Sequence, residues 1–279
     1  MKSTVRFEIR HFYATLTLLF FVMASIQPAL AGYGLKLKDA YLTFFIEVDD
    51  NRIAKLIGLP LEGDYLFDLN KASLIFTPQG SEVAYKLSVS PLERALPKAL
   101  FSRDTKRDGV FLLGYDTVHW RLSTNNKDCK EIYSSKKLGD MAKITMTDLS
   151  RINIALAYIT GQNLSNPCSS HVVSKAVGNM MGLPLHSYSM EDSSDFEVKK
   201  ILEDVTLTGH KMPENIVPFN EDAQADYLET LLTENAYKSY LQTVKLLGKS
   251  GITKVKALKQ LLKWPENRRK ILPNIGLVP

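Results

Sequence analysis

Apolar and polar residues alternate over much of the first half of the chain, as in strands that bury one face. The segment 82–90 shows this most clearly, with one face formed by Val83, Tyr85, Leu87 and Val89. A Pro-Gln-Gly-Ser turn separates it from another apolar run at 72–77, and the pair predicts a hairpin. The same pattern predicts further strands at 41–48, 110–113, 117–123 and 142–146.

The apolar spacing then changes to steps of three and four, which predicts helices. The first helix is expected over 148–160, with Thr147 as its N-cap and Gly161 after its end. Its buried stripe consists of Leu149, Ile152, Leu156 and Ile159. A second helix is expected from Ser169 or Ser170 to about Met181, because Gly182 and Pro184 follow.

The remaining chain is expected to be a loop at 185–195 followed by helices at 196–205, 222–247 and 253–264, with a linker at 209–219. Strands followed by helices predict an α+β fold: a mainly antiparallel sheet with packed helices, then a helical C-terminal region. The expected organisation is a signal peptide at 1–31, an α+β domain at 32–195 and the helical region at 196–279.

The first 31 residues have the three parts of a secretory signal peptide. Basic residues at the start precede an apolar run at 16–24, and the small residues Ala29 and Ala31 precede Gly32. The apolar run is shorter than the roughly 20 residues that span a bilayer, which argues against a membrane anchor. Cleavage after Ala31 is therefore expected, with a periplasmic or extracellular destination and no transmembrane segment in the mature chain.

Removing 31 residues from 279 leaves 248, enough for one large or two small domains. The leader holds three basic residues and Glu8, so it supplies +2 of the net charge of +5. The mature chain then carries about +3, which does not indicate a nucleic-acid partner.

Cys129 and Cys168 are the two cysteines of the chain. In an oxidising compartment two such residues usually pair, and closing this loop stabilises the fold by roughly 3–4 kcal/mol in the chain-entropy model. The alternative is a catalytic thiol at Cys168, since His171 lies three residues later. A structural disulfide is the preferred interpretation, because a neighbouring thiol would tend to oxidise a nucleophile.

The segment 175–184 resembles the outline of a zinc-peptidase helix of the metzincin kind. That family places two histidines one turn apart for zinc and a glutamate between them to activate water. Lys175 and Asn179 stand at the histidine positions, Ala176 stands at the glutamate position, and His186 comes one residue late for a third ligand. An active zinc site of this type is excluded, and no metal or cofactor is predicted.

Four histidines lie in the mature chain, and no two are spaced i, i+4. Strand alternation places His119 with Arg121 on the face opposite Trp120, which predicts a solvent-facing position for His119. The functional alternative is an open-face site in which Arg121 and Tyr115 bind an anion. The weak catalytic candidates are His119, Arg121, His171 and His186.

Basic residues accumulate near the C-terminus, where the predicted helix at 253–264 has a narrow apolar stripe. This helix could dock on an envelope protein or an anionic surface, or it could simply pack on the domain with a solvated basic face.

The sequence therefore predicts an exported bacterial protein that acts as a non-catalytic binding or interaction module of the cell envelope. The alternative is an extracytoplasmic hydrolase whose site is assembled from dispersed residues, including a diverged peptidase-like scaffold without zinc ligands.

Overall fold

The computed structural model describes residues 31–38, 43–59, 62–105, 108–124, 127–160, 168, 171–190, 195–206 and 212–230, together with positions 238, 241, 242 and 245. All of these described residues belong to one compact unit. In these described segments no helix is long and apolar enough to cross a membrane.

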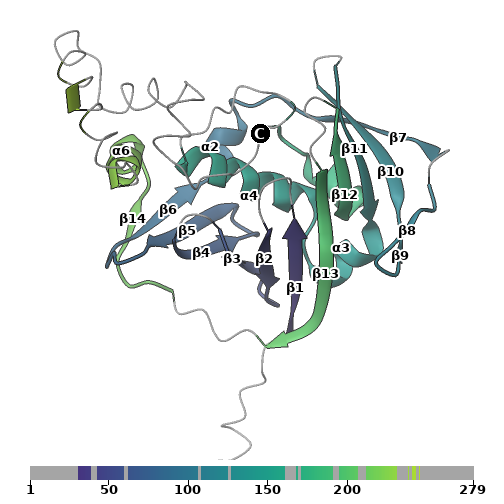
Figure 1. The fold of residues 1–279 in the computed structure, drawn as a ribbon, viewed down its shortest axis with the longest axis horizontal. Coiled ribbons are helices and arrows are strands. Elements are labelled where there is room, and N and C mark those ends of the chain that lie inside the picture. The colour runs from purple at the N-terminus through teal and green to yellow at the C-terminus, as the bar shows by residue number, and fades with distance from the viewer. Residues whose placement is uncertain are drawn as a thin grey trace, which may run out of the picture. The chain divides into compact units, whose positions relative to one another are not determined.

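One large sheet dominates the fold (Figure 1). Its strands are β1 (Ala31–Lys38), β2 (Thr43–Val48), β3 (Ile53–Ile57), β4 (Gly63–Asp68), β5 (Ser73–Pro78), β6 (Ala84–Ser88), β7 (Leu100–Arg103), β10 (Val118–Thr124), β11 (Lys127–Ser135), β12 (Leu183–Ser189), β13 (Asp195–Thr206) and β14 (Ile216–Pro218). A separate hairpin consists of β8 (Phe111–Leu112) and β9 (Tyr115–Asp116).

The strands of the large sheet follow the order β14-β6-β5-β4-β3-β2-β1-β13-β12-β11-β10-β7. Neighbouring strands are antiparallel, except that β14 runs parallel to β6. The first strand, β1, therefore lies inside the sheet between β2 and β13, and the sheet is completed by strands from both ends of the described chain.

The helices are α2 (Ser90–Glu93), α3 (Lys136–Ala142), α4 (Met146–Ile159), α5 (Lys175–Met181) and α6 (Glu221–Thr230). Figure 1 shows α4 lying against the strands. Ile152, Leu156 and Ile159 of α4 share the main core with sheet residues such as Leu37 and Phe76. The spacing that predicts this helix is thus the spacing of its buried side chains.

The segment 212–230 packs on the far end of the same sheet. The N–H of Phe219 donates to the carbonyl of Lys86 at 2.8 Å, which continues the β14–β6 pairing. Phe219 and Tyr227 then bury their rings beside Phe76, with ring centroids 5.0 and 5.3 Å from it. This aromatic cluster attaches α6 to the sheet.

The predicted α+β class, with strands first and helices after, is wrong. The structure is mostly one mixed sheet with few helices, and strands continue after α5 as β12, β13 and β14. The predicted helix at 196–205 is the long strand β13, and the first part of the predicted loop at 185–195 belongs to β12, which ends at Ser189. Of the C-terminal helices, the start of 222–247 is confirmed by α6, whereas 253–264 lies outside the described residues.

Other local predictions have mixed outcomes. The hairpin of 72–77 and 82–90 is confirmed as β5 and β6, and the helix at 148–160 is confirmed as α4. The N-cap of α4 is Thr145, two residues before the predicted one. The predicted strand at 142–146 is wrong, because Ala142 ends α3 and Met146 begins α4.

Candidate functional site

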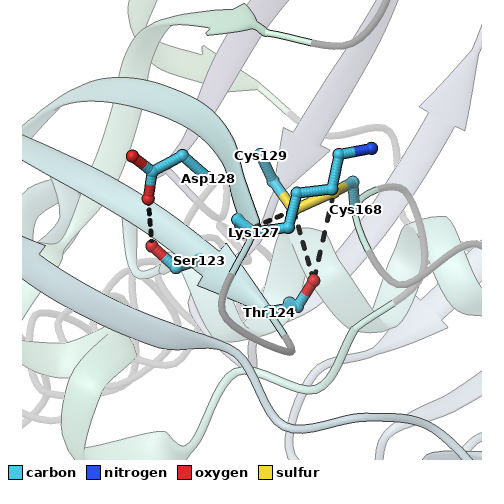
Figure 2. The surroundings of a disulfide bond; sticks show 6 residues. All are labelled: Ser123, Thr124, Lys127, Asp128, Cys129 and Cys168. Atoms are coloured by element: carbon cyan, nitrogen blue, oxygen red, sulfur yellow. Dashed lines mark hydrogen bonds between the residues drawn. A yellow bond between two sulfur atoms is a disulfide. The ribbon is translucent and has the colours of Figure 1, made fainter.

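Cys129 and Cys168 form a disulfide, with Cα atoms 5.1 Å apart (Figure 2). It joins β11 to the segment that follows α4, and both cysteines are buried. The Thr124 hydroxyl lies 3.2 Å from the sulfur of Cys129. The predicted disulfide is present, and both sulfur atoms are in the bond, which leaves no thiol on Cys168 to act as a nucleophile.

A bulge in β11 aims Cys129 at the disulfide. Leu122 pairs with Lys130 and Ser123 pairs with Asp128, so Cys129 is an extra residue between two paired ones. Such a bulge turns one side chain to the other face of the sheet. Cys129 thereby joins a small core with Trp120, Leu122 and Met181 on the helix-bearing side.

His119 lies on the face of β10 that points away from this small core, and Arg121, two residues later, lies on the same face. It is fully buried, with no exposed surface, so its predicted solvent-facing position is wrong. The β7–β8 connection bonds to its backbone: the N–H of Asp104 donates to the carbonyl of His119 (3.0 Å), and the N–H of His119 donates to the carboxylate of Asp108 (2.9 Å).

Two carboxylates flank the His119 ring. Oδ2 of Asp104 lies 3.8 Å from Nδ1, and Oε2 of Glu131 lies 3.6 Å from Nε2. Neither ring nitrogen makes a hydrogen bond. Arg121 lies on the same side, with Nη2 3.4 Å from the Asp104 carboxylate. The four charged or titratable groups form a polar cluster, which we call the His119 cluster: Asp104, His119, Arg121 and Glu131.

Asp108 closes the edge of this cluster. The backbone N–H of His119, followed by the Arg103 guanidinium, holds the pKa of Asp108 below its ordinary value. The guanidinium lies 2.7 Å from the carboxylate. The connection between β7 and β8 is thus attached to β10 by a carboxylate that is charged at neutral pH.

His186 lies on the same sheet face as His119 but does not enter the cluster. Cross-strand pairing places Tyr133 between them, since His119 pairs with Tyr133 and Tyr133 pairs with His186. The ring centroids are 4.7 Å apart for the first pair and 6.2 Å apart for the second. Three rings therefore follow one another across β10, β11 and β12.

His171 lies on the helix-bearing side of the sheet. Its carbonyl accepts a hydrogen bond from Ser150 of α4 (2.7 Å), and the next residue, Val172, bridges to Lys98. The fold therefore brings His119 and Arg121 together and places His186 beside Tyr133. His171 belongs to a different layer.

The expected anion site of Arg121 and Tyr115 does not form. The Tyr115 hydroxyl donates to Glu203 of β13 (3.3 Å), while Arg121 already faces a carboxylate. An open hollow of about 470 Å³ lies elsewhere, at the ends of β3, β4 and β5. Its polar lining includes Glu62, Asp64 and Gln79, and none of the predicted site residues lines it.

Close packing accounts for the glycine spacing of the peptidase-like segment. A Cβ on Gly178 would lie 1.9 Å from Thr147 Oγ1 of α4, and one on Gly182 would lie 2.4 Å from the backbone of Lys136. These glycines let α3, α4 and α5 approach one another. Among the residues that the structure describes, no group of three His, Cys, Asp or Glu side chains is arranged to hold a metal ion.

The His119 cluster brings basic and acidic groups of β10, β11 and the β7–β8 connection together, but its imidazole has no exposed atom with which to reach a substrate. Sequence reasoning missed its carboxylates. Glu131 lies on a strand that was not predicted, and no site was predicted at Asp104 or Asp108. The sequence signal that could have revealed the cluster was the alternation of polar residues along the neighbouring strands β10 and β11.

No known protein family matches the chain, and no curated protein does. The solved structures that are similar to it in part include the following two. PNGF-II is 12% identical with a TM-score of 0.42, and the alignment covers 71% of this chain and 33% of that one. An uncharacterised conserved protein from Thermus thermophilus is 8% identical with a TM-score of 0.34, covering 72% and 98%. The chain thus spans about a third of PNGF-II, and both TM-scores are too low to support an inference from either likeness.

Proposed function

We propose that the chain is an exported, non-catalytic binding module of the bacterial cell envelope. The observation that carries this proposal is the burial of His119, which is the best-placed candidate for acid–base chemistry. A general base must lie within hydrogen-bond reach of the proton that it removes. His119 has no exposed surface, and the carboxylates of Asp104 and Glu131 lie 3.8 and 3.6 Å from its two ring nitrogens.

The disulfide supports the extracytoplasmic part of the proposal, because disulfides persist in oxidising compartments. The leader at 1–31 supports export, with cleavage after Ala31. The exported chain would then act in the periplasm or on the extracellular side of the envelope.

A hydrolase with a dispersed site is the second candidate. One observation favours it: His119 and Arg121 lie in the same cluster as two carboxylates. Reaction would require a movement that exposes the ring, because His119 is fully buried. The binding proposal needs no such movement, and we therefore prefer it.

Two measurements on the purified exported protein test the choice. Sedimentation with isolated bacterial envelopes should show saturable binding, and His119→Gln should bind equally well once its folding is verified by circular dichroism. Incubation with ester, peptide and glycoside substrates should show no turnover that depends on His119.

Turnover by the wild type that His119→Gln abolishes would establish the hydrolase instead. Absence of saturable envelope binding would reject the binding module. Recovery of the chain with its leader intact from the cytoplasm would contradict export.

A further inference from the structure

The ring of His119 is buried without a hydrogen bond on either of its nitrogens. The Nε of Arg121, two residues later on the same face, is also buried without a hydrogen bond. Buried polar groups nearly always have a partner, because a group removed from water without one destabilises the fold. The His119 cluster therefore holds hydrogen-bonding capacity that the neutral ring does not use.

A carboxylate lies beside each nitrogen of the ring. Oδ2 of Asp104 is 3.8 Å from Nδ1, and Oε2 of Glu131 is 3.6 Å from Nε2. Both distances exceed the roughly 2.7–3.2 Å of an N–H···O hydrogen bond by less than 1 Å. A neutral imidazole has one N–H, so it can donate to only one of these carboxylates and turns a lone pair towards the other. An imidazolium has two N–H groups and can donate to both.

The charges around the ring also favour the imidazolium. With a neutral ring, the two carboxylates face a single compensating cation, because Nη2 of Arg121 lies 3.4 Å from Asp104. The cluster then has one negative charge in excess, and a proton on His119 removes it. Burial of a ring opposes its protonation, whereas carboxylates within about 4–6 Å favour it. Here two carboxylates act in the same direction.

The remaining groups beside the ring are accounted for in the same way. Asp108 accepts the backbone N–H of His119 and pairs with Arg103, and these contacts hold the pKa of Asp108 below its ordinary value. Histidine is the residue type in this part of the described structure that titrates between about pH 5 and 8. The ring of Tyr133 separates His119 from His186.

The cluster lies where an edge strand joins the sheet. β7 is the last strand of the order, and it pairs with β10 (Figure 1). Asp104 directly follows β7, and its N–H donates to the carbonyl of His119 at 3.0 Å. Glu131 lies on β11, the other neighbour of β10. A protonated ring would therefore join the end of β7 and the strand β11 to one residue of β10.

We propose that protonation of His119 controls how firmly the edge strand β7 is attached to the sheet. This inference goes beyond the proposed function and does not depend on it. At acidic pH the ring takes a proton from solvent and donates one N–H to Asp104 and the other to Glu131, in two charge-assisted hydrogen bonds. As the pH rises the proton returns to solvent, one carboxylate again faces a lone pair, and the attachment weakens. The protonated ring is favoured by the closed cluster, so the stabilisation is present at acidic pH and is lost as the pH rises.

Amide hydrogen exchange, followed by NMR on the purified protein between about pH 5.5 and 8, tests this attachment. After correction for the intrinsic pH dependence of exchange, the protection of the Asp104 N–H should fall by about tenfold as the pH rises. A factor of this size corresponds to the loss of one charge-assisted hydrogen bond. Ring chemical shifts should identify His119 as an imidazolium at the acidic end. Amides paired between β4 and β5, far along the sheet, should keep their protection.

His119→Gln removes the titrating ring and keeps a polar side chain, so the protection of the Asp104 N–H should become independent of pH. Glu131→Gln removes one of the two carboxylates and should reduce the tenfold change. His186→Gln is the matched control, because His186 lies on the same sheet face beyond Tyr133. It should retain the pH dependence of the wild type.

A wild-type ring that stays neutral over the whole pH range would overturn the proposal, and this measurement needs no variant to fold. Protection of the Asp104 N–H that is constant with pH, or that rises with it, would overturn it as well. So would a pH dependence that persists in folded His119→Gln, because another group would then control the attachment of β7.

Discussion

Asp148 joins three parts of the fold through one buried carboxylate. It accepts hydrogen bonds from the N–H and hydroxyl of Thr145, at 2.9 and 3.0 Å, in the capping box of α4. It also pairs with Arg52 of the β2–β3 turn at 2.9 Å. Arg52 in turn donates to the carbonyl of Lys143. The start of α4 is thus attached directly to the sheet.

We expect Asp148→Asn to lower the free energy of unfolding by about 2–3 kcal/mol, because the charge that caps the helix and faces Arg52 is lost. Urea unfolding measures this loss. Asp140→Asn is the control, since Asp140 is 62% exposed and pairs with Lys136 on the surface of α3; it should cost less than about 0.5 kcal/mol. Equal effects of the two substitutions would contradict the proposed network.

At the residue scale, the sequence predicts the sheet face on which a side chain lies better than it predicts whether that side chain is buried. Strand alternation correctly places His119 and Arg121 opposite Trp120. His119 is nevertheless fully buried, and its neighbours Asp104 and Asp108 lie in the β7–β8 connection, whose path apolar periodicity does not predict. The sequence therefore predicts that His119 and Arg121 share a strand face. It does not predict that carboxylates from other segments gather around them.

At the scale of elements, the bulges of β13 explain why the segment 196–205 was predicted to be a helix although it forms a strand. Lys36 pairs with Lys200 while Leu37 pairs with Val198, so one residue of β13 is extra. The inward-facing Val198 and Ile201 are consequently three residues apart, which imitates helical spacing. By contrast, β6 pairs regularly over Ser73 to Phe76 of β5, and its period of two predicts it correctly.

Helix α5 depends on contact at Gly178 more than on helix propensity. We expect Gly178→Ala to destabilise the fold by about 1–3 kcal/mol, because the added methyl group collides with Thr147. In an isolated helix the same change would stabilise by roughly 1 kcal/mol, so the sign of the effect is diagnostic. Thermal or urea unfolding measures it.

Asn179→Ala is the companion variant, because Asn179 is exposed on the same helix. Its free energy of unfolding should stay within about 0.5 kcal/mol of the wild type. A stabilised Gly178→Ala protein would show that α4 and α5 do not approach closely.

At the scale of the whole molecule, buried tyrosines set an alkaline limit to stability. Burial raises the pKa of Tyr65 on β4 and of Tyr227 on α6, whose hydroxyl oxygens lie 3.4 Å apart. The unfolded chain then loses these protons first, near pH 10, so the stabilisation is complete below that pH and falls as the pH rises above it. Each tyrosine should contribute a loss of about 1.4 kcal/mol per pH unit.

Urea unfolding across this alkaline range should show a shallower loss for Tyr65→Phe than for the wild type. Tyr188→Phe should leave the slope unchanged, because Tyr188 is 40% exposed. An identical slope in the wild type and Tyr65→Phe would show that Tyr65 ionises normally in the folded protein.

The position of β1 inside the sheet has a consequence for the rate and order of folding. Leu35 pairs with Ile46 on one side and with Ile201 on the other, so one edge of β1 stays open until nearly all the described chain is available. Closing so long a loop is slow, because its entropy is lost before strand pairing stabilises the contact. Sheets rich in contacts between distant parts of the sequence fold on the order of milliseconds to seconds. During that interval an apolar strand edge is exposed to other chains. Newly made molecules therefore need dilution or a holding chaperone until β13 arrives.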